Sequence, residues 1–362
     1  MRTLPLHETH VQAGAEFEPY GGWLVPAHFG DPSGEYEAAT QHAALFDLSC
    51  RTIVQLAGPD ARTFLNNLCT NDVKALPIGA GCEAFLLTAK GRVVAHGLIG
   101  HFQLADAAAL WLDTVPGQAA TILGHLDHYL ISEQVELADR SADFGVFHVA
   151  GPRSEAIVQA ASGANVTDLS PLHHIALESC HLRRHAFLGV DGYDLIFPVE
   201  RGAQLWTALG DAGAVPAGME TRETLRIEAG VPEFGADFDE QRLGMEVGRT
   251  PQAISFSKGC YLGQETVVMA RDRGHVNRAL MGVQATDDGL LPEGARLVRG
   301  EEEAGQITST TYSPSVKRAI GLAYLRRGNQ ESGTELLVEP VNEGHRVQVV
   351  ALPFRGGAIT AV

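Results

Sequence analysis

The sequence predicts an α+β protein with two α+β lobes and a C-terminal domain of β-strands. Three observations support this prediction: a strand, Gly-Pro turn and helix pattern that occurs twice, a β-hairpin pattern after the first copy, and a series of short strand patterns after residue 277. A chain of 362 residues is also too long for one ordinary domain. We therefore place a domain boundary near residue 275, between a module of residues 1–274 and a C-terminal domain of residues 275–362.

The repeated pattern is a short apolar strand that ends in Gly-Pro and continues into a helix. Residues 53–56 (IVQL) are the first strand, and Gly58 and Pro59 follow them. Residues 147–150 (FHVA) and the Gly-Pro pair that begins at Gly151 repeat this pattern 93 residues later. Proline suits the beginning of a helix because its missing N–H would have no partner there. Two copies indicate two related lobes, and a chance match is the alternative.

Other elements follow from local patterns. Residues 84–89 and 92–99 flank Lys90-Gly91 and predict a β-hairpin. Residues 221–229 predict a helix capped by Thr221, with Gly230 after its end. Six short strand patterns at regular spacing predict a sandwich or a barrel at the C-terminus. They cover residues 280–284, 295–298, 305–309, 320–324, 335–338 and 346–352.

The charge and composition exclude several classes of protein. The 44 acidic residues exceed the 27 basic ones and give a net charge of −17, which argues against direct binding of nucleic acid. No stretch has the roughly 18 apolar residues that a membrane helix needs, and the N-terminus does not resemble a signal peptide, so we expect a cytoplasmic protein away from membranes. The five cysteines form no Cys-x-x-Cys pair and the 15 histidines show no metal-binding spacing, so we predict no metal site.

The most informative stretch for chemistry is residues 258–265 (KGCYLGQE). Lys258 lies two residues before Cys260, and a nearby cation favours the thiolate form of a cysteine. The structural alternative is a turn that enters a helix, with the thiol simply buried. Residues 249–278 carry five basic and two acidic residues, a local charge of +3 that would suit an anionic ligand.

The chain resembles the aminomethyltransferase superfamily, which includes the T-protein of the glycine cleavage system, and the resemblance runs nearly end to end. It implies an aminomethyltransferase-type fold, in which two α+β lobes and a C-terminal β-barrel surround a pocket for tetrahydrofolate or another reduced folate. The segments that carry it are residues 6–8 (LHE), 21–26 (GGWLVP), 46–49 (FDLS), 70–73 (TNDV), 221–230 (TRETLRIEAG) and 305–315 (GQITSTTYSPS).

Within this superfamily, residues 258–265 resemble the folate-binding proteins that assist iron–sulfur cluster assembly and, in bacteria, tRNA thiolation enzymes. This resemblance implies that Lys258 and Cys260 act together beside the folate pocket, and that Tyr261 and Gln264 contribute to it. It also implies iron–sulfur assembly machinery or cluster-containing client enzymes as partners, with reduced folate as the ligand. A single cysteine cannot hold a cluster alone, so ligation would require a second chain.

The resemblance also suggests folate contacts. Residues 189–194 (GVDGYD) are similar to a T-protein run whose last carboxylate binds the pterin edge, which implies that role for Asp194. Arg222 and Arg226 lie on the predicted helix and are candidates for the anionic tail of folate. Their spacing places both on one helix face, so the sequence does not choose between them.

Three functions remain open from the sequence. T-proteins carry an Asp-Asp pair in the hairpin, and Ala95 and His96 occupy these positions here. The resemblance implies that the first aspartate of this pair assists methylene transfer, and Ala95 occupies its position. Alanine can neither transfer a proton nor stabilise charge. The sequence therefore favours a folate-binding accessory protein for iron–sulfur cluster assembly or repair. The alternatives are a folate-dependent aminomethyltransferase or demethylase, and a tRNA-binding module.

Overall fold

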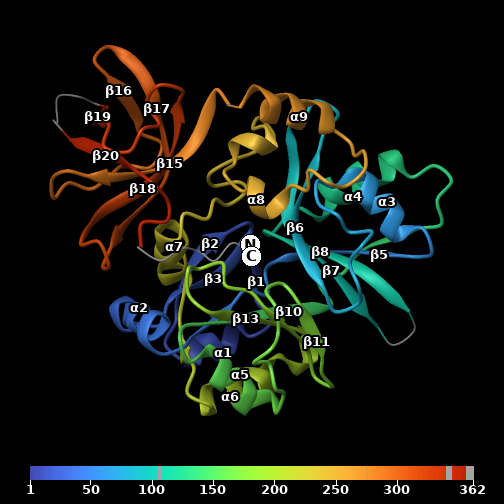
Figure 1. Cartoon of the computed structure of the whole chain (residues 1–362). Helices are drawn as coiled ribbons and strands as arrows, with labels where there is room; N and C mark the ends of the chain where they lie inside the picture. The colour runs from blue at the N-terminus through green and yellow to red at the C-terminus, as the bar shows by residue number, and fades with distance from the viewer. Residues whose placement is uncertain (105–106, 275, 340–344, 356–362) are drawn as a thin grey trace.

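A computed structural model describes residues 1–104, 107–274, 276–339 and 345–355. Figure 1 shows two lobes and a separate barrel around a central region that contains the α7 and α8 helices. The mixed α+β architecture with a C-terminal barrel is confirmed.

The first lobe contains a five-stranded antiparallel sheet with helices packed on one side. The helices are α3 (Ala61–Leu68) and α4 (Ala119–Tyr129). The strand order is β6 (Gly81–Leu87), β7 (Val93–Gln103), β8 (Ala108–Thr114), β5 (Thr52–Ala57) and β9 (Glu136–Asp139). The predicted hairpin is confirmed as β6 and β7, joined through Thr88 and Gly91, whose backbone groups form the turn.

The second lobe contains a six-stranded sheet, with helices α5 (Ser154–Ser162) and α6 (Gly202–Asp211) beside it. Its strand order is β11 (His174–Ala176), β12 (His181–Arg184), β13 (Gly192–Pro198), β10 (Phe144–Ala150), β4 (Ala44–Asp47) and β14 (Val215–Pro216). A short 3-10 helix, η1 (Val199–Arg201), precedes α6.

The N-terminal segment forms a smaller layer against the second lobe. Its three-stranded sheet contains β1 (Arg2–Thr3), β3 (Trp23–His28) and β2 (Glu16–Tyr20). Helix α1 (His7–Gln12) lies between β1 and β2 in the sequence, and α2 (Pro32–Gln41) follows β3. The side chain of Asp31 caps α2 by accepting a hydrogen bond from the Gly34 amide.

The two copies of the strand, Gly-Pro turn and helix pattern have the same backbone geometry. Gly58 has φ +113° and Gly151 has φ +130°, a region that favours glycine. In both turns the glycine carbonyl accepts a hydrogen bond from the first helical residue, Ala61 or Ser154. A Cβ at Gly58 would lie 2.3 Å from a backbone oxygen, and one at Gly151 would lie 2.5 Å from another. The repeated sequence therefore encodes a repeated structural unit.

Helix α7 (Met219–Glu228) begins two residues earlier than predicted, so the expected cap at Thr221 is wrong. The N-cap is Gly218, where a Cβ would lie 2.1 Å from the Ala27 carbonyl oxygen of β3. Close packing against β3 therefore requires glycine at this position. Thr221 lies in the first turn instead, and its hydroxyl donates to the carboxylate of Glu35 on α2.

The C-terminal strands form a closed six-stranded barrel, which decides between the sandwich and the barrel. Short elements connect α7 to this barrel: the 3-10 helix η2 (Gly244–Glu246), α8 (Thr250–Ala253) and α9 (Gln264–Arg273). The barrel order is β15 (Arg278–Ala285), β18 (Arg318–Arg326), β17 (Glu302–Ser313), β16 (Arg296–Arg299), β19 (Glu335–Val338) and β20 (Arg346–Val350).

One hydrophobic cluster joins the first lobe to the barrel across the central helices. It contains Phe85 and Val93 of the hairpin, Ile227 of α7, Tyr261 before α9 and Leu322 of the barrel. Burial of these side chains provides a driving force of roughly 1.5–3 kcal/mol for each large apolar residue. The cluster therefore holds the barrel and the hairpin at fixed positions around the centre of the molecule.

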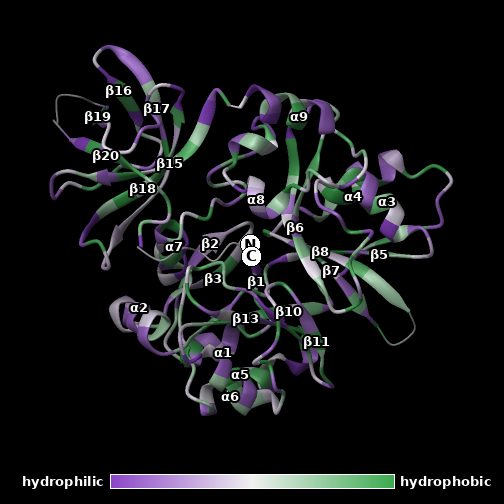
Figure 2. Ribbon diagram, viewed as in Figure 1, coloured by the Kyte–Doolittle hydropathy of each residue, from purple (hydrophilic) through white to green (hydrophobic). Residues whose placement is uncertain are grey.

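Hydrophobic residues are spread over short elements rather than collected in one long helix. Figure 2 shows hydrophobic and hydrophilic residues mixed along the helices and the barrel strands. In the described part of the chain, no helix has the length and apolar character that crossing a membrane requires.

The turn geometry predicts a large cost for Gly58→Ala. The substitution forces alanine into a positive φ and against the Gln134 carbonyl oxygen, so we expect a loss of about 2 to 5 kcal/mol in unfolding free energy. Gly124→Ala is the matched control, because Gly124 lies on α4 and a Cβ added there would have no atom within 4 Å, and it should stabilise by about 0.5–1 kcal/mol. Urea unfolding measures both, and equal effects would contradict the assigned turn.

Candidate functional site

A cleft lies between the first lobe, the segment after β12 and the loops after α7. It comprises a cavity of about 280 Å³ and an adjoining one of about 80 Å³. The residues that line both cavities are Glu83, His185, Phe187, Val231 and Arg249. Because acidic, basic and aromatic side chains meet at this common boundary, the cleft is suited to a ligand with both flat and charged parts.

The carboxylate of Glu83, on β6, is fixed by two other residues of this cleft, Arg249 and His96. Its carboxylate accepts two hydrogen bonds from Arg249, at 2.8 Å from Nε and 2.5 Å from a terminal nitrogen, and lies 2.7 Å from Nε2 of His96. Burial alone would raise the pKa of Glu83, but hydrogen bonds and charge from Arg249, with help from His96, hold it far below its usual value. The carboxylate therefore stays ionised.

The register of β7 corrects the role assigned to Ala95. Successive residues of a strand point to opposite faces. Ala95 is 2% exposed and packs in the apolar core of the first lobe, whereas His96 lines the smaller cavity. The strand position of Ala95 thus faces away from the cleft, and its lack of a carboxylate says nothing about the chemistry there. The residue to consider is His96.

Asp194 on β13 is buried among protein donors. One carboxylate oxygen lies 2.8 Å from Nδ1 of His148, and the other accepts from Arg183 at 2.7 and 3.0 Å and lies 2.8 Å from Nδ1 of His185. Burial would raise the pKa of Asp194, but the charges of His185 and Arg183 hold it well below its usual value. His185 lines the cleft in front of it, so a direct contact of Asp194 with a ligand stays a prediction.

Arg183 also joins the two lobes, because its guanidinium donates to Asp113 on β8 at 2.5 Å as well as to Asp194. Arg51 donates to the other oxygen of Asp113. These groups are all buried or half-buried, and a buried charge is stable only with such partners. The bridge fixes the distance between the lobes beside the cleft.

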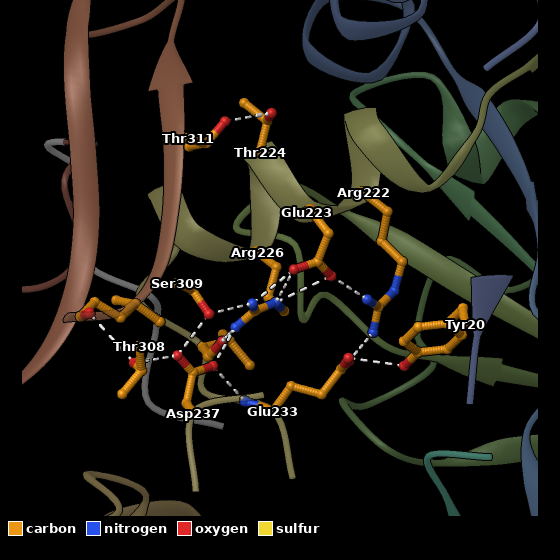
Figure 3. Close-up of polar contacts among 12 residues, drawn as sticks. Tyr20, Arg222, Glu223, Thr224, Arg226, Glu233, Asp237, Thr308, Ser309 and Thr311 are labelled. Atoms are coloured by element: carbon orange, nitrogen blue, oxygen red, sulfur yellow. Dashed lines mark hydrogen bonds and ion pairs between the residues drawn. The ribbon is translucent and has the colours of Figure 1, made fainter. Parts of the chain in front are cut away.

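The two arginines of α7 have different surroundings, as Figure 3 shows. Arg226 uses all five of its N–H groups: the acceptors are Glu223, the Val231 carbonyl, Asp237 and Ser309. Arg226 thus connects α7 to the following loop and to the barrel strand β17. It has no N–H left for a ligand.

Arg222 lies on the wall of the smaller cavity and keeps a free donor. Its terminal nitrogens donate to Glu223 and to Glu233, while its buried Nε has no partner in the described structure. Tyr20 donates to the same Glu233 carboxylate at 2.7 Å, as drawn in Figure 3. The guanidinium carbon lies 5.7 Å from the ring centre of Phe187, which also lines the cleft. Both arginines line the smaller cavity, and of the two only Arg222 has an Nε–H without a partner in the described structure.

Lys258 anchors its segment to the first lobe. Its ammonium donates to the carbonyl oxygens of Asn66, Cys69 and Asn71 at 2.6, 2.8 and 2.7 Å. The nearest thiol in its described contacts is that of Cys69, at 4.0 Å, rather than that of Cys260. Burial lowers the pKa of Lys258. The expected pairing of Lys258 with Cys260 is therefore replaced by a structural anchor.

The rest of residues 258–265 packs in a similar way. Tyr261 is buried in the cluster between hairpin and barrel. Gly263 has φ +81°, and a Cβ there would lie 2.5 Å from the Thr88 carbonyl of the hairpin turn. Gln264 is the first residue of α9 and is half-buried. Neither Tyr261 nor Gln264 lines the two cavities of the cleft, so their contact with folate stays a prediction.

Cys260 differs from its neighbours because it is exposed, whereas the other four cysteines are buried or half-buried. Burial raises the pKa of Cys69 to about 11, which makes that thiol unreactive. Within the described residues, no group of three or more His, Cys, Asp or Glu side chains could hold a metal ion. A cluster bound to Cys260 would need ligands from elsewhere.

Sequence reasoning does not single out Glu83, His185 or Phe187. Glu83 meets Arg249 across 166 positions of the chain, and no local pattern reports such a pair. The available signals are the basic balance of residues 249–278, which includes Arg249, and the loosely clustered histidines of residues 181–185, for which the sequence alone favours surface or core roles.

The anchor role of Lys258 predicts that Lys258→Met lowers the unfolding free energy by about 2 to 4 kcal/mol, because three buried carbonyls lose a charged donor. Cys260→Ser is the control within the same motif, and its exposed side chain should change stability by less than about 0.5 kcal/mol. Guanidinium unfolding tests both variants. An unchanged unfolding free energy in Lys258→Met would show that the anchor does not stabilise the fold.

Family models match both parts of the chain. The GCVT N-terminal domain matches residues 6–254, and the glycine cleavage T-protein C-terminal barrel domain matches residues 278–355. The expected superfamily is thereby confirmed.

Proteins of similar sequence align with nearly the whole length of this chain. An aminomethyltransferase from Rubrobacter xylanophilus is 31% identical, over 98% of this chain and 94% of its own length. One from Legionella pneumophila is 30% identical over 92% of each chain. The crystal structure of the glycine cleavage system aminomethyltransferase T from Bartonella henselae has the same fold, with a TM-score of 0.89, 23% identity and coverage of 98% of each chain. The chain therefore belongs to the glycine cleavage T-protein family.

Proposed function

We propose that this protein binds a reduced folate in the cleft and catalyses a folate-dependent one-carbon transfer of the aminomethyltransferase type. Membership in the T-protein family supports this proposal, since tetrahydrofolate is the one-carbon carrier of the family. The observation that carries it is the cleft itself, where the side chains of Arg222, Phe187 and His185 line the same space. Demethylation is the related reaction on the same scaffold.

The residues of the cleft fit a reduced folate. A pterin ring is flat and carries both N–H donors and acceptors, and the tail of folate carries carboxylates. Two residues that line the cleft each carry a buried polar atom without a partner in the described structure: Nε of Arg222, a donor, and Oε1 of Gln252, an acceptor. Phe187 stacks on His185, with 4.6 Å between ring centres, and provides an aromatic wall. An unpaired buried group is costly, so a ligand that satisfies both atoms gains affinity.

Each residue would then have a separate task. When bound, the reduced folate receives the one-carbon unit from an amine donor. Arg222 binds an anionic or acceptor group of the ligand through its guanidinium, while its ion pair with Glu233 fixes the position of that group. Asp194 holds Nδ1 of His185 and so orients that ring at the wall. Lining side chains of the segment after β12 exclude water from the transfer step.

A direct test measures tetrahydrofolate binding by calorimetry, followed by formation of methylenetetrahydrofolate from an aminomethylated donor. We expect saturable binding and turnover above background. Binding without turnover would favour an accessory role, and absence of binding would contradict the proposal.

The free donor of Arg222 predicts a specific loss of affinity. We expect Arg222→Gln to weaken tetrahydrofolate binding about 10- to 100-fold, because a charge-assisted hydrogen bond of about 1.5–3 kcal/mol is lost. Arg299→Gln, an exposed arginine on the barrel strand β16, is the control and should leave affinity unchanged. Calorimetric titration of both variants, with thermal unfolding to verify folding, decides the point. Unchanged affinity in folded Arg222→Gln would remove this residue from the site.

A second candidate function is the accessory role in iron–sulfur cluster assembly or repair. One observation favours it: Cys260 is exposed in a segment whose other motif residues are explained by packing. An exposed thiol is available to a partner protein, and a cluster shared with that partner would meet the requirement for further ligands. Under this proposal the folate cleft and Cys260 serve the same client enzymes.

The accessory role predicts the outcome of complementation. In cells that lack this protein, wild type should restore the activity of a cluster-dependent tRNA thiolation enzyme, and Cys260→Ala should not. Cys180→Ala, a buried cysteine of the second lobe, is the control and should restore activity if the variant is present at wild-type abundance. If Cys260→Ala complements as well as wild type, the thiol has no part in the function.

A further inference from the structure

Strands β6 and β7 and the residue before α8 place a histidine, a carboxylate and an arginine in a row on the cleft wall. Oε1 of Glu83 lies 2.7 Å from Nε2 of His96 and 2.8 Å from Nε of Arg249, and Oε2 accepts from Arg249 at 2.5 Å. Both Glu83 and Arg249 line both cavities, and His96 lines the smaller one. The row therefore runs from Glu83 and Arg249, which the two cavities share, to the imidazole ring of His96 in the smaller cavity.

The protonation of the row follows from the chemistry of its members. Glu83 is held ionised by Arg249, and an ionised carboxylate can only accept hydrogen bonds. The hydrogen between Glu83 and His96 therefore belongs to Nε2 of the ring. A neutral His96 then has its lone pair on Nδ1, which makes that atom the proton acceptor.

The ring and its partner are held firmly. The His96 ring stacks on Phe85 with 4.7 Å between centres, and it lies 5.7 Å from the ring of Phe238. Arg249 begins the α8 segment, which is tied to the first lobe: Asn71 donates to the Gln252 carbonyl at 3.0 Å, and Thr70 donates to the Ala253 carbonyl at 2.6 Å. Both ends of the row are therefore fixed by contacts with the first lobe.

We propose that His96 is the group that moves a proton in the transfer reaction, and that Glu83, clamped by Arg249, is the positioning residue that fixes its tautomer. This inference rests on the proposed function of the cleft. It gives a role to His96, the second position of the T-protein Asp-Asp pair, whereas the sequence comparison placed the catalytic position at Ala95.

The proposed step moves one proton and no electrons. Nδ1 of His96 takes a proton from an attacking amine of the substrate as that nitrogen forms its bond to the transferred carbon. The bond from this carbon to the departing amine breaks, and His96 returns its proton to that amine. A second exchange of the same kind completes methylenetetrahydrofolate: the other folate amine bonds to the carbon, the bond to the donor's remaining substituent breaks, and that substituent takes up the proton. The ring is neutral before and after the step, so the cycle needs no oxidant or reductant.

Other charged groups share the smaller cavity and must be considered in any pH measurement. They are Arg51, His185, Arg222, Arg226 and Glu233. The arginines stay charged throughout the accessible range, and the carboxylate of Glu233 is paired with Arg222. Burial lowers the pKa of His185 from its usual value, and its Nδ1 is held by Asp194.

Nitrogen-15 NMR of the folate-free protein tests the tautomer directly, with His96→Gln used to identify the His96 signal. We expect wild type to show the tautomer protonated at Nε2. In Glu83→Gln the amide can donate to Nε2, so the proton should move to Nδ1 in a substantial fraction of molecules. Thermal unfolding and tetrahydrofolate titration show whether each variant is folded and binds ligand. Wild type protonated at Nδ1 would overturn the proposal, whatever the variants do.

Kinetics of methylenetetrahydrofolate formation provides the second measurement. Glu83→Gln should lower kcat at least tenfold with KM nearly unchanged, and His96→Gln should lower kcat further. Equal kcat in wild type and folded His96→Gln would overturn the role of His96. One further outcome for wild type is no turnover together with the Nε2 tautomer. That outcome would support the positioning role of Glu83. It would contradict both the proposed transferase activity and the proton-moving role of His96.

Discussion

The central constraint on this molecule is the burial of the Arg226 guanidinium, whose N–H groups must all find acceptors inside the protein. Arg226 meets it with acceptors from its own helix, from the loop after α7 and from the barrel strand β17. Three parts of the chain are thereby held at one point, and breaking such a network typically costs several kcal/mol. Arg222 lies one turn earlier on α7 and is positioned by the same helix. The wall of the cleft therefore depends on Arg226, although Arg226 has no free N–H with which to bind a ligand.

Most of the fold can be predicted because its signals are local. The Gly-Pro turns, the hairpin and the six barrel strands are each recognisable within about ten residues, and the structure has them at these places. The start of α7 differs from the prediction because its cap depends on a contact between Gly218 and Ala27, which are distant in sequence. Threonine at the first turn is a sound cap signal, but close backbone packing overrides it.

The site is less predictable because its groups meet across long stretches of chain. Resemblance finds the arginines of α7, but only the structure shows that one is saturated and the other has a free donor. Proximity in sequence pairs Lys258 with Cys260, whereas the ammonium points to carbonyls nearly 190 residues earlier. The expectation for Ala95 fails for a related reason: alignment gives a position, while the pleat of a strand decides which neighbour faces the ligand.

The packing of residues 258–265 also bears on how the history of such chains can be interpreted. Lys258, Tyr261 and Gly263 would be retained by selection for folding alone, whatever reaction the protein performs. Cys260 is under no such constraint, since its side chain is exposed and its replacement should leave the fold intact. Among related proteins that keep the fold, loss of the cysteine at position 260 would identify those that no longer use the thiol. Retention of the cysteine would identify those that still use it.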